Sequence, residues 1–214
     1  MDLTQYKKAW ENQPEEKNRL SAIEIYKMTQ AKSTSIVKWI FIIGIVEFAF
    51  WFFINSFATS HGAFEPYEVL NLMSFLDYTT YIHYGVILLF LLLFYRNYSA
   101  ISAIDDTKTL MKKILRTRKT VKWYVYYNLI GVVILTIILN ILIFNSPDAI
   151  DAFYNINSAT LDKGQIMAVV IITLIVMLGL MLLFLWLFYY LLYGILLKKL
   201  NRNYKELTKL EEAK

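Results

Sequence analysis

The chain has 214 residues and a formal net charge of +5; 57% of its residues are hydrophobic and only 18% are charged. An ordinary soluble domain is closer to half apolar and a quarter charged. Because the excess is concentrated in a few long runs, the composition excludes a soluble globular protein and a disordered one. The chain has no cysteine and only two histidines, so we expect no disulfide, no metal centre and no other cofactor.

Residues 1–35 form a polar N-terminal region that is predicted to be helical. The phrase Ser21-Ala22-Ile23-Glu24 has the form of a capping box and predicts a helix that ends at about residues 32–35. Four side chains of this region are apolar although no membrane span explains them. They are Tyr6, Trp10, Ile25 and Met28. We predict that they contact a cytoplasmic partner; packing against the end of the protein's own fourth span is the alternative.

Four stretches are long and apolar enough to cross about 30 Å of hydrocarbon, which takes about 20 helical residues. They lie at about residues 36–58, 79–95, 123–144 and 166–190. Inside lipid every backbone polar group must be paired, so each stretch is predicted to be a helix. The predicted fold class is therefore all-α: a polytopic membrane protein whose four spans, within residues 36–197, form two tandem hairpins.

Basic residues set the predicted orientation of the spans. Of the 22 Lys and Arg residues, all but Lys163 lie in the N-terminal region, at the mouth of the first span, in the loop 96–122 or in the tail 198–214. The positive-inside rule therefore places both termini and that loop in the cytoplasm. Aromatic residues near the span ends, including Tyr189, Tyr190 and Tyr193, are interpreted as anchors at the headgroup level.

The loop 96–122 is too long for a simple turn and is predicted to contain an amphipathic helix capped by Asp105-Asp106. Its basic face is predicted to contact anionic lipid, and a plainly solvated basic face is the alternative. The basic residues concerned are Lys112, Lys113, Arg116, Arg118 and Lys119.

The fourth span stays apolar for 32 residues, which exceeds the hydrocarbon by about 18 Å. Apolar residues continue after it at helical spacing, so we predict one helix from about residue 165 to the end. Residues 198–214 would be its cytoplasmic extension. In the outer loops, Pro66-Tyr67-Glu68 and Pro147-Asp148 each predict a short amphipathic helix, the first reaching Leu76.

Two tripeptides recur at corresponding places in the two hairpins. Val37-Lys38-Trp39 returns as Val121-Lys122-Trp123, and Arg96-Asn97-Tyr98 returns as Arg202-Asn203-Tyr204. The pattern is consistent with a parallel duplication of one hairpin. Tripeptide matches arise easily in a biased composition, so independent convergence on basic and aromatic residues at membrane edges is the favoured explanation, with duplication as the alternative.

Glu47 is the sharpest chemical feature, because it lies at the middle of the first span. An acidic group there costs about 2.5–3.5 kcal/mol on insertion scales, so it should face the bundle and be protonated or paired. One interpretation is a proton or cation relay, and the other is a structural hydrogen bond between helices. Three other polar residues lie within the spans: His83, Asn128 and Asn140. Asn140 is expected to form a hydrogen bond between helices.

Enzyme motifs are missing from the sequence. It contains no phosphate-binding loop, no H-E-x-x-H zinc motif, no G-x-S-x-G elbow and no dinucleotide-binding glycine motif. We therefore predict that the protein is not an enzyme, and we expect no direct contact with nucleic acid.

Three segments carry a family resemblance. Residues 32–40, 116–129 and 191–204 resemble a family of uncharacterised four-span inner-membrane proteins of Gram-negative bacteria. Some members are labelled beta-carotene 15,15'-monooxygenase, but such oxygenases hold iron with a set of four histidines, which this chain lacks. Genes of the family often follow a gene for an extracytoplasmic-function sigma factor. The resemblance therefore implies a bacterial inner membrane and a regulator of the anti-sigma type.

Our leading hypothesis is a non-enzymatic inner-membrane regulator or scaffold that binds a cytoplasmic protein, with a sigma factor as the suspected partner. The alternative is a small homodimeric transporter or channel with Glu47 in its pathway.

Overall fold

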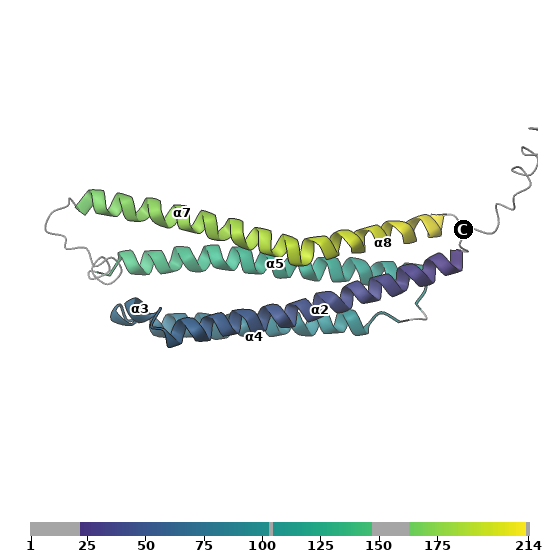
Figure 1. The fold of residues 1–214 in the computed structure, drawn as a ribbon, viewed down its shortest axis with the longest axis horizontal. Helices are drawn as coiled ribbons and strands as arrows, with labels where there is room; N and C mark the ends of the chain where they lie inside the picture. The colour runs from purple at the N-terminus through teal and green to yellow at the C-terminus, as the bar shows by residue number, and fades with distance from the viewer. Residues whose placement is uncertain (1–21, 103–104, 147–162, 213–214) are drawn as a thin grey trace, which may run out of the picture.

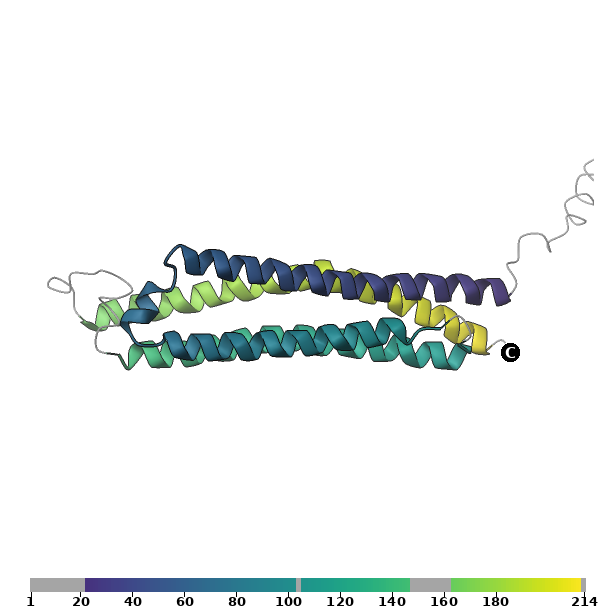
Figure 2. The ribbon, with the colours of Figure 1, turned by 90° about the horizontal axis from the view of Figure 1, so that it is seen from below.

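The structure is a computed structural model that describes residues 22–102, 105–146 and 163–212. In these residues the chain is all-α, with four long helical segments side by side along one axis (Figures 1 and 2). The elements are α2 (Ala22–Ser60), α3 (Glu65–Val69), α4 (Met73–Ser99), α5 (Thr107–Phe144), α7 (Lys163–Tyr189), the π-helical turn Tyr190–Gly194 and α8 (Ile195–Glu212). Four helices are long and apolar enough to cross a membrane, which confirms the polytopic all-α fold.

The chain changes direction between its long helices, so its basic segments lie together at one end of the bundle. The start of α2, the α4–α5 loop and the end of α8 lie at one end of the bundle, and α3 lies at the other (Figure 1). We call the first of these ends the basic end, because the lysines and arginines that flank the spans gather there.

Helix α2 joins two elements that the sequence predicted to be separate. It runs without interruption from Ala22 to Ser60, so the predicted end at residues 32–35 is wrong. Ser33 and Thr34 do not break the helix because their hydroxyl groups donate to the carbonyls of Thr29 and Gln30, at 2.8 and 3.0 Å. Each hydroxyl group forms its hydrogen bond with the preceding turn of its own helix, and the backbone hydrogen bonds of the helix remain intact.

The amphipathic helix predicted in the middle loop is present, but it is also continuous with the third span as α5. Asp106 is its N-cap, and its carboxylate accepts a hydrogen bond from the Thr109 amide at 3.3 Å, as predicted for this acidic pair. Thr117 and Thr120 donate back to carbonyls of their own helix at 3.0 Å each. As in α2, the boundary of the membrane is not a boundary of the helix.

The helix predicted from Pro66 to Leu76 is divided in two. Element α3 ends at Val69, and α4 begins at Met73. Asn71 separates them with a φ of 56°, a left-handed conformation that asparagine tolerates better than most residues do. The other predicted outer helix, which begins at Pro147, lies outside the described residues.

The fourth segment is continuous from Lys163 to Glu212, in agreement with the predicted long helix. A π-helical turn at Tyr190–Gly194 joins α7 to α8, and the segment bends where the two helices meet (Figure 1). Leu200 and Leu207 of α8 are fully buried, so the extension packs on its own bundle.

The bundle has two apolar cores that meet end to end. The first lies within the spans and includes Ile40, Phe94 and Tyr124. The second lies at the basic end, and we call it the basic-end layer; its buried residues are Val37, Leu110, Ile114, Leu200 and Leu207. Toward the other end, many apolar side chains of α2, α5 and α7 are exposed, which suits helices that contact lipid tails.

The two hairpins bury corresponding positions, as a parallel repeat would. A shift of 84, the interval from Val37 to Val121, superposes five buried positions: 30, 33, 37, 40 and 44 of α2 correspond to 114, 117, 121, 124 and 128 of α5. A shift of 106, the interval from Asn97 to Asn203, matches buried positions 87, 94 and 97 with 193, 200 and 203. A buried helical face recurs every three or four residues, so one shared buried position fixes the others, and the register agrees with both the repeat and convergence. Glu47 departs from the repeat, because Gly131 stands at the corresponding position.

Gly44 is predicted to be a packing requirement of the fold. A Cβ atom at Gly44 would lie 2.9 Å from Leu91 and 3.2 Å from the buried ring of Phe94, whereas one at Gly131 would meet no atom within 4 Å. We expect Gly44→Val to lower the free energy of unfolding by about 1–3 kcal/mol through overpacking. Gly131→Val is the matched control and should have little effect. Thermal unfolding in detergent measures both, and equal losses would contradict the packing.

Candidate functional site

Glu47 lies in the interior of the bundle with 3% of its surface exposed. The hydroxyl of Tyr193 donates a hydrogen bond to its Oε2 atom at 2.7 Å. The other carboxyl oxygen, Oε1, is buried and has no hydrogen-bond partner among the described residues. The carboxyl is therefore half satisfied, with one oxygen available for a proton or another donor.

Three tyrosines surround this carboxyl, and we call them with Glu47 the tyrosine cluster. Tyr124, Tyr189 and Tyr193 are each at most 5% exposed. The centroid of the Tyr124 ring lies 5.7 Å from that of Tyr193 and 6.1 Å from that of Tyr189. The hydroxyl groups of Tyr189 and Tyr124 also lie beside the carboxyl. The cluster thus offers phenol groups, which both donate and accept hydrogen bonds.

The interpretation of Tyr189 and Tyr193 as headgroup anchors is wrong. Both face the interior at the level of Glu47, while Tyr190 between them is 53% exposed. An aromatic residue near the end of a span can lie either at the headgroups or inside the bundle. The signal that distinguishes the two positions is an acidic residue on another span that needs a hydrogen-bond donor. The spacing of four between the two tyrosines, which repeats one helical face, was the only local indication.

The π-helical turn supplies one member of the cluster. Tyr193 lies within it, and its last residue is Gly194, where a Cβ atom would be 3.0 Å from the Tyr190 ring. A π turn holds one more residue than an α turn and so changes the face that the following residues present. The turn therefore lets Tyr189 of α7 and its own Tyr193 face Glu47 while α8 directs its apolar face at the basic-end layer.

The other polar residues predicted within the spans lie apart from the carboxyl. Asn128 is buried, and its amide donates to the carbonyl of Tyr124 in its own helix at 2.8 Å. The amide of Asn140 likewise donates to Thr136 of α5 at 2.8 Å, so within the described residues it does not form the predicted bond to a neighbouring helix. His83 stacks on Tyr127, with ring centroids 5.7 Å apart.

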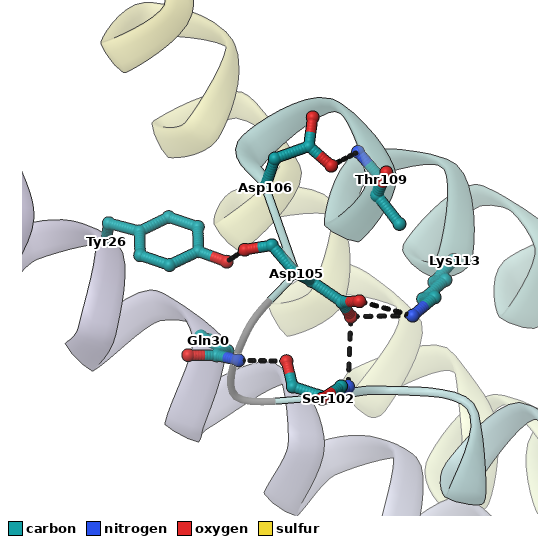
Figure 3. A network of polar contacts seen from close by, with 7 residues as sticks. All are labelled: Tyr26, Gln30, Ser102, Asp105, Asp106, Thr109 and Lys113. Atoms are coloured by element: carbon teal, nitrogen blue, oxygen red, sulfur yellow. Dashed lines mark hydrogen bonds and ion pairs between the residues drawn. The ribbon is translucent and has the colours of Figure 1, made fainter.

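At the basic end, a polar network holds the α4–α5 loop against α2 (Figure 3). The Lys113 ammonium pairs with both oxygens of Asp105, at 2.6 and 2.7 Å, and the backbone amide of Ser102 donates to the same carboxylate at 2.9 Å. From α2, Tyr26 donates to the backbone carbonyl of Asp105 and Gln30 to that of Ser102. Lys113 therefore forms an ion pair within the protein.

Two ionisable groups in this region, the Tyr26 phenol and the Asp106 carboxylate, keep their charge states around neutral pH. Burial raises the pKa of the Tyr26 phenol, and the nearby charges of Asp105 and Asp106 raise it further, so the phenol remains a donor. Hydrogen bonds from Thr109 lower the pKa of Asp106, so the cap of α5 remains an anion.

Buried amides also join helices at the basic end. Asn203 of α8 donates to Ser33 of α2 at 3.0 Å, and Asn97 of α4 donates to Thr120 of α5 at 3.1 Å. Both asparagines come from the recurring Arg-Asn-Tyr phrase, and each reaches from one hairpin to the other. The recurring tripeptide therefore contributes hydrogen bonds that join the two hairpins.

The structure places the predicted contact residues in different surroundings. Tyr6 and Trp10 lie outside the described residues. Ile25 is half-buried, whereas Met28 is 45% exposed. Among the basic residues, Lys112, Arg116 and Lys119 are exposed. Arg118 differs from them, because it is half-buried and its Nε atom is buried with no acceptor among the described residues.

No group of three or more histidine, aspartate or glutamate residues that could hold a metal ion occurs in the part of the chain that the structure describes.

Comparison with protein families gives one match. Residues 23–212 match the family described as a domain of unknown function, DUF8845, and the chain belongs to this family. No curated protein and no solved structure matches the chain.

The bond between Tyr193 and Glu47 is predicted to contribute to stability. Tyr193→Phe leaves the buried carboxyl without its donor and should lower the free energy of unfolding by about 1–3 kcal/mol. In a Glu47→Leu background the same change should cost much less, because both partners are then apolar. Tyr190→Phe, on the exposed side of the same turn, is the control. Thermal unfolding in detergent tests this, and strictly additive losses would contradict the coupling.

Proposed function

We propose that this member of the DUF8845 family is a non-enzymatic regulator or scaffold of a bacterial inner membrane, with both termini in the cytoplasm and a basic end that binds a cytoplasmic protein. The observation that carries the proposal is the basic-end layer, where all four helical segments pack on one another beyond the apolar spans.

The size of this layer supports a role outside the membrane. The 18 residues of α8 span about 27 Å, nearly the thickness of the hydrocarbon, and they follow a segment that is already long enough to cross it. Helices that served only to anchor the chain would not need an additional core. The core residues, the buried amides and the Lys113–Asp105 pair make the layer a rigid platform.

The surface of the platform supports protein binding. On the part of α2 that precedes the first predicted span, Ile23 is 67% and Met28 is 45% exposed. Leu115 of α5 is 42% exposed among the basic residues of its helix. Apolar side chains surrounded by charge are typical of a surface that receives an apolar face of another protein. A sigma factor is the candidate partner that the family resemblance suggests.

The alternative function, a small homodimeric transporter or channel, has one observation in its favour: the spare buried oxygen of Glu47. Three buried tyrosine rings enclose that carboxyl, and the groove found between α5 and α7 is lined by apolar residues elsewhere. Under our proposal, reconstituted protein should not dissipate a proton gradient across vesicles. Proton flux in the wild type that Glu47→Gln abolishes would instead support transport.

Crosslinking in cells tests partner binding directly. A photoreactive amino acid at Met28 should form a crosslink to a soluble protein, because this side chain projects from the basic end. The same probe at Val46, which is 62% exposed within the span of the same helix, should reach only lipid. Met28→Glu should weaken co-purification of the crosslinked protein at least fivefold, as for a contact worth about 1 kcal/mol.

The same crosslinking experiment on a chain that lacks residues 1–21 tests the predicted contacts of Tyr6 and Trp10. Mass spectrometry identifies the captured protein. A sigma factor would support the regulator, and another soluble protein would support the scaffold. The absence of any soluble crosslink from both Ile23 and Met28 would refute the proposal.

A further inference from the structure

We propose that the face between α5 and α7–α8 holds one anionic phospholipid, with an acyl chain in an apolar groove and the phosphate at Arg118. This inference is independent of the proposed regulatory function. It rests on the groove, on the position of Arg118 along the same face of α5 and on the basic residues of α8 at the same level of the bundle.

The groove supplies the apolar part of the site. Its volume is about 330 Å³, and its lining is apolar throughout: Leu129, Ile130 and Val133 from α5, and Leu182 and Trp186 from α7. The Trp186 ring stacks on that of Tyr190, with centroids 5.7 Å apart and planes at 17°. This pair extends the wall of the groove toward the basic end. An acyl chain matches such a surface because it is narrow, flexible and wholly apolar.

Arg118 lies on the same face of α5 as the groove. Positions 118, 122, 125, 129 and 133 follow one another at intervals of three or four, which places them on one stripe of the helix. The eleven residues from Arg118 to Leu129 span about 16 Å. Half of the hydrocarbon thickness is about 15 Å. A phosphate at Arg118 would therefore leave the groove within reach of the acyl chains of one leaflet.

Arg118 supplies the donor for the phosphate. Its Nε atom is buried and lacks an acceptor among the described residues, although a buried donor is normally paired. A guanidinium binds phosphate through two parallel N–H···O bonds, so a small rotation of this half-buried side chain would pair Nε as well. Lys122, one turn further along the stripe, is exposed and is the next cation on this face.

Helix α8 adds positive charge at the same level of the bundle. Lys108 pairs with Glu211 at 3.4 Å, and residues 129–133 of α5 face residues 182–186 of α7 across the groove. Because the two segments are antiparallel, this register sets Arg118 at the level of Lys198 and Lys199, which are both exposed. The concentration of cations favours a headgroup with net negative charge over a zwitterionic one, whose ammonium would be repelled.

Native mass spectrometry of the delipidated, detergent-solubilised full chain tests the headgroup. We expect the protein to retain phosphatidylglycerol at least fivefold more tightly than phosphatidylcholine with the same acyl chains. Arg118→Gln should reduce this preference at least fivefold. Arg116→Gln, an exposed arginine on another face of the same helix turn, should leave it unchanged. Equal losses in the two variants would show only general charge attraction and would overturn the proposal.

A second pair of variants tests the groove with Arg118 intact. Ile130 lines the groove and is 55% exposed, so Ile130→Trp should fill it and weaken retention of phosphatidylglycerol without disturbing the core. Ile134 is 52% exposed one turn away and does not line the groove, so Ile134→Trp is the matched control. Thermal unfolding verifies that all four variants are folded. If Ile130→Trp retained the lipid as well as Ile134→Trp does, the site would be refuted.

Discussion

Hydrocarbon offers no hydrogen-bond partners, and the organisation of this protein depends on that constraint. The backbone meets it with continuous helices, in which the amides of Asn128 and Asn140 donate to carbonyls of the preceding turn. Buried side chains meet it in pairs within the spans, as when Tyr193 donates to Glu47, and buried side chains at the basic end are paired in the same way, as when Asn203 donates to Ser33. Because these pairs join different helices, satisfying the polar groups also sets how the helices are rotated and aligned.

The membrane-spanning helices could be predicted from the length of the apolar runs, whereas the contacts between these helices could not. Each predicted span lies in a described helix, and Asp106 caps α5 as its position suggested. The continuity of α2 was missed because a run of Ser and Thr reads as a helix end when its hydroxyl groups have no evident acceptor. The inward orientation of Tyr189 and Tyr193 was missed because it depends on the rotation of the fourth segment, which a periodic sequence does not specify.

The tyrosine cluster and the basic-end layer occupy neighbouring levels of one bundle. Tyr193 belongs to the first core, and Leu200, two turns further along, belongs to the second. The two halves of the chain contribute to both levels through matching positions, apart from Glu47, whose counterpart is Gly131. A repeat would have provided the platform, and one acidic substitution would have given its interior a polar centre.

Helix α8 is sensitive to length as well as to composition, because one of its faces is buried. Lipid-facing helices often accept a change of one residue, since any rotation still presents apolar side chains to the tails. Within the π-helical turn the loss of one residue would restore an α turn and leave α8 facing the same way, because a π turn holds one residue more. Removing one residue between Ile195 and Lys199 would instead turn the rest of α8 by about 100° relative to α7. Leu200 and Asn203 would then leave the interior while Tyr189 and Tyr193 stayed in place. Among natural variants of this chain, insertions and deletions should therefore avoid α8 and accumulate in the connections at the opposite end.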